Sequence, residues 1–123
     1  MSLKNPLPKS FHYAADGIRE AVKNEPNFRF HLLAAIFVII AGLKLGLSQP
    51  EWFAIGFSIF FVIILELVNT SLEAITDLVS PKFHSRAKVA KDVAAAAVLL
   101  ASIFALIIGA AIFIPKLSLI FPK

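Results

Sequence analysis

The stretch ELVNTSLEAITDLVSPKFHSRAKVAKD, residues 66–92, begins inside a long apolar run and ends where the next apolar run starts. Its first polar residues are Glu66, Asn69, Glu73 and Asp77, at offsets of 0, 3, 7 and 11. A helix with 3.6 residues per turn places these four side chains in one narrow stripe. Ionisable groups at membrane depth cost about 2.5–3.5 kcal/mol each on insertion scales, so a functional site is the first hypothesis for this stripe.

The apolar runs on either side of this stretch indicate a membrane protein. The chain has 123 residues, of which 59% are hydrophobic and only 16% charged. This length allows one small domain. We therefore predict an all-α integral membrane protein with an amphipathic surface helix over residues 10–25 and three transmembrane helices over residues 28–48, 51–80 and 86–114.

Prolines mark most of the predicted helix boundaries. Residues 1–9 are expected to form an arm, and Ser10 is the predicted N-cap of the surface helix. The other predicted boundaries lie at Pro26, Pro50, Pro81 and Pro115. The second span would be about 30 residues or ~45 Å long, so we expect it to project beyond the hydrocarbon.

Small residues recur in the third apolar run. Ala97, Ala101, Ala105 and Gly109 are spaced four residues apart. Small side chains at this spacing allow a neighbouring helix to approach closely. The pattern therefore predicts tight helix packing along this face.

The basic residues predict an orientation in the membrane. Nine of the twelve lie before the first apolar run or in the loop between the second and third, namely Lys4, Lys9, Arg19, Lys23, Arg29, Lys82, Arg86, Lys88 and Lys91. The other side of the membrane receives Lys44, Lys116 and Lys123. This excess of lysine and arginine on one side predicts that the N-terminus and the 81–92 loop lie in the cytoplasm.

The carboxylates at that surface favour hard metal ions. Glu25, Glu73 and Asp77 offer oxygen ligands, the chain has no cysteine, and its three histidines lack a zinc-site spacing. Oxygen ligands beside a basic loop fit Mg²⁺ carrying a nucleotide, whose phosphates Arg86, Lys88 and Lys91 could hold. There is no Gly-rich phosphate loop, so such a nucleotide site would be of an unusual kind.

Glu66 lies deeper, where it could orient or deprotonate a lipid hydroxyl. Together these groups favour phosphoryl transfer at a membrane surface. Two alternatives remain open from the residues alone. The stripe could join helices in an oligomer, for which Asn69 is best suited, or it could form a cation or proton pathway.

The sequence ELVNTSLEAITD, followed by a short loop and AKDVAAAAV, resembles the bacterial diacylglycerol kinase family, which includes the undecaprenol kinases. The resemblance covers nearly the whole chain, including the NEPNFR segment before the first span. Its most specific part is E-x-x-N-x-x-x-E-A-x-x-D with A-K-D downstream. The resemblance implies a small enzyme of the bacterial inner (cytoplasmic) membrane. This enzyme would use MgATP to phosphorylate a lipid hydroxyl and would have no nucleic-acid partner.

The resemblance also implies roles for individual residues. Glu25 and Glu73 correspond to metal-binding carboxylates, and Glu66 to the catalytic base. The remaining polar residues of the implied nucleotide site are Arg29, Asn69, Asp77, Lys91 and Asp92. The best-known member is a homotrimer in which neighbouring subunits share the site.

The choice of lipid follows from finer features. The VSPKFH loop and the AKDVAAAAV run are more similar to Gram-positive undecaprenol kinases than to the enterobacterial diacylglycerol enzyme. The latter has a polar and acidic pair where this chain has Phe30 and His31. Undecaprenol is the favoured substrate, and diacylglycerol is the alternative.

Overall fold

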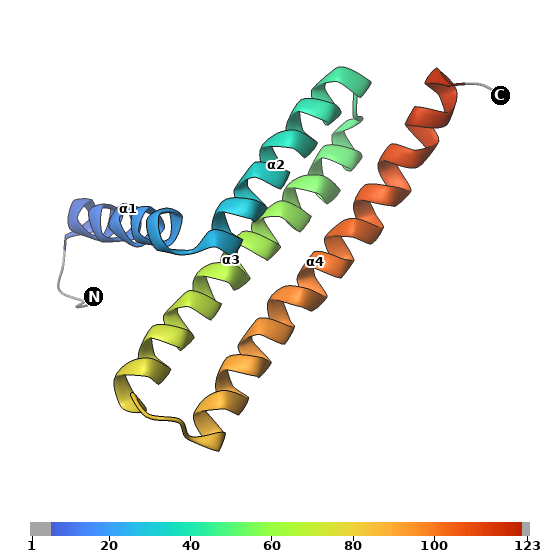
Figure 1. Cartoon of the computed structure of the whole chain (residues 1–123). Helices are drawn as coiled ribbons and strands as arrows, with labels where there is room; N and C mark the ends of the chain where they lie inside the picture. Colours follow the sequence, from blue (N-terminus) through green and yellow to red (C-terminus); the bar gives the residue numbers. More distant parts are fainter. Residues whose placement is uncertain (1–5, 122–123) are drawn as a thin grey trace.

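Four helices make up the part of the chain that the computed structural model describes, residues 6–121. They are α1 (Leu7–Asn24), α2 (Pro26–Leu45), α3 (Gln49–Val79) and α4 (Ser85–Ile120). No strand occurs within residues 6–121, so the predicted all-α class is confirmed. Figure 1 shows α2, α3 and α4 running alongside one another, while α1 leaves the foot of α2 sideways.

The three long helices are each long and apolar enough to cross a membrane, as predicted. The 20 residues of α2 give ~30 Å, which matches the hydrocarbon core of a bilayer. The 31 residues of α3 give ~46 Å. In Figure 1, α2 lies beside only one half of α3, and the other half continues with α4 past the α1–α2 junction. The stripe that begins at Glu66 lies on this continuing part of α3.

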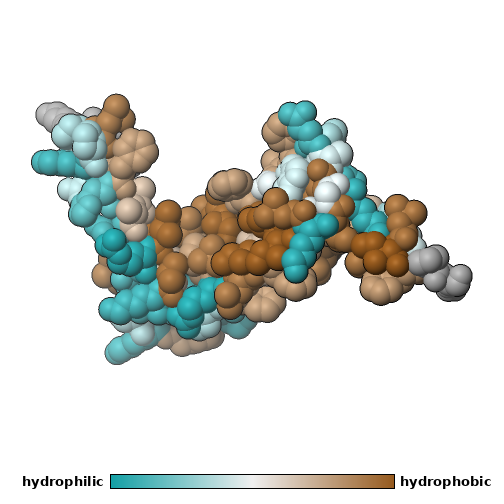
Figure 2. Space-filling view, turned by 90° about the horizontal axis from the view of Figure 1, so that it is seen from above, coloured by the Kyte–Doolittle hydropathy of each residue, from teal (hydrophilic) through white to brown (hydrophobic). Residues whose placement is uncertain are grey.

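α1 has the character of a surface helix. Only Ala21 is buried along its length, and the apolar side chains of Phe11, Ile18 and Val22 remain exposed. A helix with one apolar and one charged face suits the membrane interface. In the whole molecule, Figure 2 shows hydrophobic side chains through the middle and hydrophilic ones gathered toward the ends.

The predicted start of α1 was wrong. The helix begins at Leu7 after Pro6, three residues before the expected cap at Ser10. Pro8 lies in the first turn, where a missing N–H leaves no hydrogen bond unmade, so this proline does not oppose the helix. The rest of the predicted arm, residues 1–5, lies outside the described residues.

The predicted end of the third span at Pro115 was also wrong, because α4 continues through this proline to Ile120. A proline removes one helical hydrogen bond, but neighbouring groups can compensate. The next residue, Lys116, forms an ion pair of 3.1 Å with Glu51, and the Ser118 hydroxyl donates a hydrogen bond of 2.7 Å to the Pro115 carbonyl. The ion pair attaches the last turns of α4 to the start of α3, whereas the hydrogen bond of Ser118 lies within α4.

The most extensive contact in the molecule is between α3 and α4. Ile55 and Val62 of α3 are buried, as are Ala94, Val98 and Ala101 of α4. Small side chains on α4 allow the two backbones to approach. Of the predicted small-residue face only Ala101 lies in this core, at 2% exposure, and the residue one turn before it, Ala97, is exposed.

A tight turn joins α2 to α3. Gly46 ends α2 with a φ of 68°, a left-handed conformation that glycine adopts without a steric penalty. The Ser48 backbone N–H then donates a hydrogen bond of 2.7 Å to the Glu51 carboxylate at the start of α3. Pro50 lies in the first turn of α3, as predicted.

Gly42 is the tightest glycine of the chain, and we expect Gly42→Ala to destabilise the fold by about 1–3 kcal/mol. A Cβ atom there would lie 2.8 Å from the Trp52 ring and 3.3 Å from the Leu47 side chain. Unfolding by denaturant in detergent micelles measures the loss. Gly56→Ala is the control, because a Cβ at Gly56 meets nothing within 4 Å. Equal stability of the two variants would contradict the prediction.

Candidate functional site

Glu66 is the buried carboxylate of the described chain, with 4% of its surface exposed. Glu66 follows the buried residues Ile55, Ser58 and Val62 at helical spacing along α3. The side chain of Glu66 therefore lies on the same buried face and points toward the neighbouring helices. His31 of α2 lies beside it, with Nε2 3.1 Å from Glu66 Oε1. This pair joins α3 to the first turns of α2. The imidazole of His31 gives the buried carboxylate of Glu66 a hydrogen-bonding partner, which a buried charge requires.

Two further carboxylates lie near Glu66. Glu25 and Glu73 are both close enough for their negative charges to act on it. Glu25 is the residue between α1 and α2, because it ends the first helix and precedes Pro26 of the second. Glu73 lies two turns along α3 and accepts a hydrogen bond of 3.1 Å from the Asn69 side-chain amide. The charges of Glu25 and Glu73 thus act on Glu66, and Asn69 lies between Glu66 and Glu73 along α3.

Two buried oxygen atoms of this region have no hydrogen-bond partner among the described residues. They are Oδ1 of Asn69 and Oγ1 of Thr70. Buried polar atoms without a partner are uncommon and point to a ligand or water. The Asn69 oxygen lies on the residue that already binds Glu73, so it adds a hard oxygen to the carboxylates. Thr70 was not predicted, because nothing distinguishes a threonine in a membrane helix by sequence alone.

The donors present fit a magnesium ion that shares its coordination with phosphates. Within residues 6–121 no group of three or more histidine, aspartate or glutamate residues is arranged to hold a metal by itself. Mg²⁺ is usually bound through one or two carboxylates, with water and substrate phosphates completing its shell. Glu25, Glu73 and the free oxygen of Asn69 are ligands of this kind.

A polar hollow of about 400 Å³ lies further along α3, between the end of this helix and the start of α4. Asp77 and Lys91 form an ion pair across it, and Lys88 pairs with Asp92 along α4. His84 caps the start of α4, because its Nδ1 atom accepts a hydrogen bond of 3.1 Å from the Arg86 N–H. The predicted residues Asp77, Lys91 and Asp92 therefore share one hollow that is open to water.

Arg29 lies at the junction of α1 and α2. Its Nη1 atom donates hydrogen bonds of 3.0 and 2.9 Å to the backbone carbonyls of Val22 and Lys23. These carbonyls belong to the last turn of α1, where helical partners are lacking. Arg29 thereby fixes α1 against α2 on both sides of Glu25, a contact that the sequence could not predict.

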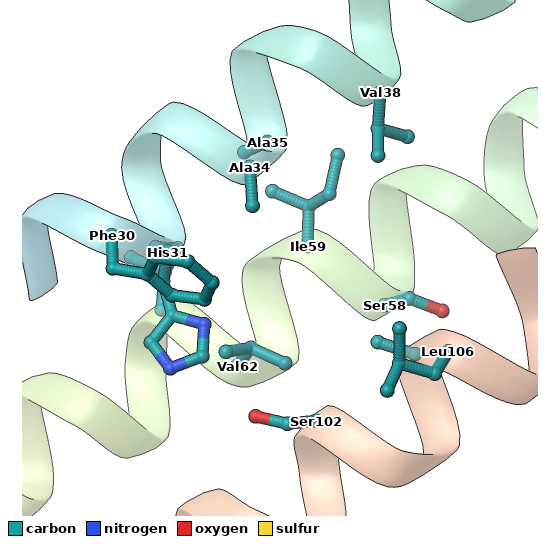
Figure 3. Close-up of a pocket in the computed structure, with 12 residues that line it drawn as sticks. Phe30, His31, Ala34, Ala35, Val38, Ser58, Ile59, Val62, Ser102 and Leu106 are labelled. Atoms are coloured by element: carbon teal, nitrogen blue, oxygen red, sulfur yellow. The ribbon is translucent and has the colours of Figure 1, made fainter. Parts of the chain in front are cut away.

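An apolar groove of about 300 Å³ includes His31, the partner of Glu66, in its lining. Figure 3 shows His31 and Phe30 of α2 at one end, with Ile59 and Val62 of α3 along it and Ser102 of α4 opposite. The hydroxyls of Ser58 and Ser102 donate to carbonyls of their own helices, at 2.9 Å each. The groove thus offers an apolar chain a path to His31, whose Nε2 atom contacts the buried carboxylate of Glu66.

Known proteins resemble this chain over most of its length. A profile of the prokaryotic diacylglycerol kinase family matches residues 12–113. The undecaprenol kinase of Bacillus subtilis is 46% identical over 109 residues, which cover 89% of each chain. A diacylglycerol kinase of Synechocystis is 42% identical over 88% of this chain and 62% of its own. The diacylglycerol kinase of Escherichia coli K12 is 31% identical over 80% of this chain and 81% of its own.

The profile covers residues 12–113, and each of these three relatives is at least 31% identical over 80% or more of this chain. The chain belongs to the prokaryotic diacylglycerol kinase family, a family of lipid kinases.

Proposed function

We propose that this protein transfers the γ-phosphate of ATP to the hydroxyl group of a membrane lipid, with undecaprenol as the favoured lipid. One observation carries the proposal. Along α3, the buried carboxylate of Glu66 comes after the residues that line the apolar groove and before those that line the polar hollow with its charged side chains. Such a position allows a lipid hydroxyl and a water-soluble phosphate donor to meet.

Glu66 is the proposed catalytic base. Its depth suits a hydroxyl at the head of a lipid whose chain follows the groove. A carboxylate within reach of this hydroxyl can orient it and accept its proton as the oxygen attacks phosphorus. Phosphoryl transfer otherwise depends on positioning and charge neutralisation, so the remaining residues need only hold the reactants in line.

Glu25 and Glu73 are the proposed magnesium ligands, with Asn69 Oδ1 beside them. Bound there, Mg²⁺ would neutralise charge on the phosphates. Lys91 and Arg29 are proposed to hold phosphate oxygens, and Asp77 and Asp92 to keep the lysines of the hollow in place. A guanidinium has five N–H donors, so Arg29 can bind the end of α1 and a phosphate at the same time.

Undecaprenol is favoured over diacylglycerol for two reasons. The Bacillus subtilis relative, which is named an undecaprenol kinase, is 46% identical over 89% of this chain. The groove is lined almost entirely by apolar groups, and both of its serines donate to their own helices. A polyprenol has no ester groups that would need hydrogen-bond donors along its chain. Diacylglycerol is the alternative, in line with the names of the other relatives.

The proposal extends to assembly and location. We infer a homotrimer with a shared site in the bacterial cytoplasmic membrane, with the N-terminus and the 81–92 loop on the cytoplasmic side. Many large apolar side chains of α2, α3 and α4 are exposed, which suits both lipid and a second copy of the chain. The basic residues of α1 and of the loop support the orientation.

A single assay tests the activity and the substrate. Purified protein in mixed micelles is given radiolabelled ATP, Mg²⁺ and one lipid from a panel of undecaprenol, diacylglycerol and ceramide. We expect label to enter the lipid phase, fastest with undecaprenol. Preference for diacylglycerol would support the alternative substrate. Absence of labelled lipid across the panel would instead favour a non-enzymatic membrane oligomer.

A further inference from the structure

His31 lies where the apolar groove meets the buried carboxylate of Glu66. Its ring belongs to the groove lining, and Phe30 packs edge-on against it with ring centroids 5.6 Å apart (Figure 3). The ring edge that carries Nε2 is 3.1 Å from Glu66 Oε1. The side chain of His31 is 19% exposed and that of Glu66 5%, so water competes little for this contact.

The charges around Glu66 give this contact its importance. Among the described residues that act on Glu66, Glu25 and Glu73 carry negative charge and repel its carboxylate. His31 is the neighbour that can donate an N–H to it, because its Nε2 atom lies 3.1 Å from Glu66 Oε1. A buried carboxylate held by one donor has one oxygen engaged and one oxygen free.

We propose that His31 is a positioning residue for phosphoryl transfer and acts through Glu66. The inference rests on the proposed function. The Nε2–H group of His31 holds Glu66 Oε1, so that Oε2 faces the lipid hydroxyl. A side chain with two rotatable bonds beyond Cβ needs such a partner to keep a productive orientation.

In the proposed phosphoryl transfer, His31 keeps its proton and forms or breaks no bond. The lipid oxygen forms a bond to the γ-phosphorus as its proton passes to Glu66 Oε2. The bond between the γ-phosphorus and the bridging oxygen of ATP breaks, and ADP leaves. The phosphorylated lipid departs, and Glu66 returns its proton to water. His31 keeps its hydrogen bond to Oε1 throughout and neither gains nor loses a proton.

The test compares His31→Ala with His31→Gln in the micelle assay with undecaprenol and MgATP. We expect His31→Ala to lower kcat by about 10- to 100-fold, as is typical when the residue that orients a functional side chain is removed. The KM for MgATP should stay unchanged, because the nucleotide side of the site is not touched. His31→Gln, which retains an N–H donor, should recover most of the lost kcat.

A matched control and a double variant exclude a merely structural effect. His12 also faces a carboxylate, with Nε2 3.3 Å from Asp16, but on the exposed surface of α1. His12→Ala should retain wild-type kcat. In the Glu66→Gln background, His31→Ala should lower the residual rate no further, because residues that act as a unit are non-additive.

A spectroscopic readout is independent of activity. In protein labelled with ¹⁵N-histidine, the Nε2 resonance of His31 should shift in Glu66→Gln, whereas that of His12 should not. Wild-type kcat in His31→Ala, a loss confined to the KM for lipid, or equal loss in the Ala and Gln variants would overturn the inference. Failure of the wild-type protein to phosphorylate any lipid would instead overturn the proposed function.

Discussion

Glu73→Gln is expected to lower the rate of lipid phosphorylation by about 100-fold or more, because a metal ion contributes several kcal/mol to charge stabilisation and each 1.4 kcal/mol corresponds to a tenfold change in rate. Glu73 is one of the two carboxylates proposed to bind Mg²⁺, and Asn69 already orients it through a hydrogen bond of 3.1 Å. The amide preserves the size of the side chain and removes its negative charge. The variant should therefore still insert into the membrane and assemble.

The measurement is the initial rate against Mg²⁺ concentration at saturating lipid and ATP. We expect the residual activity of Glu73→Gln to need more Mg²⁺ for half-maximal rate. Glu20→Gln provides the control, because Glu20 is an exposed residue of α1 whose partner within residues 6–121 is Asn24 of the same helix. Full activity of the Glu73 variant with purified lipid and MgATP would remove Glu73 from the metal site.

Glu66→Gln should lower kcat by about 10²- to 10⁴-fold, which is the usual contribution of a general base. The amide oxygen can still accept a hydrogen bond from His31, so no buried charge is left unpaired. We therefore expect little change in stability and no change in the KM for MgATP. This separates Glu66 from Glu73, whose replacement should alter the response to Mg²⁺.

Steady-state kinetics with undecaprenol, together with thermal unfolding of the same preparation, tests this second prediction. Glu51→Gln is the matched control. It makes the same chemical change on the same helix, but at the opposite end, where Glu51 pairs with Lys116. If Glu66→Gln kept the wild-type kcat, a different group would have to accept the hydroxyl proton.

Much of the fold was predictable because its signals are local. Apolar runs define the three spans, and Pro50 and Ser80–Pro81 place the ends of α3 within two residues of the predicted 51–80. The end of α4 was missed for a non-local reason. A proline reduces helix formation by a known amount, but the ion pair between Lys116 and Glu51 connects residues far apart in the sequence.

The candidate site was likewise predictable where its contacts are local in the sequence, and not where they join distant residues. Helical periodicity predicted that Glu66, Asn69 and Glu73 share a face, and the hydrogen bond between the last two, four residues apart, follows from that spacing. The pairing of Glu66 with His31 depends on how far α2 is shifted along α3, which no local pattern contains. The binding of Arg29 to the end of α1 depends likewise on the angle between two helices.

The tight turn at Gly46 has a consequence for how the chain enters a membrane. Because three residues connect α2 to α3, the two helices can insert together as a hairpin rather than one after the other. In the proposed orientation the turn crosses the lipid, and the polar groups that it carries across are few, chiefly Lys44 and Glu51. Glu51 can already bind the Ser48 N–H within the hairpin, and Lys116 can neutralise it only after α4 has followed. The insertion of α4 thus supplies Lys116, the basic partner that Glu51 lacks while only α2 and α3 are in place.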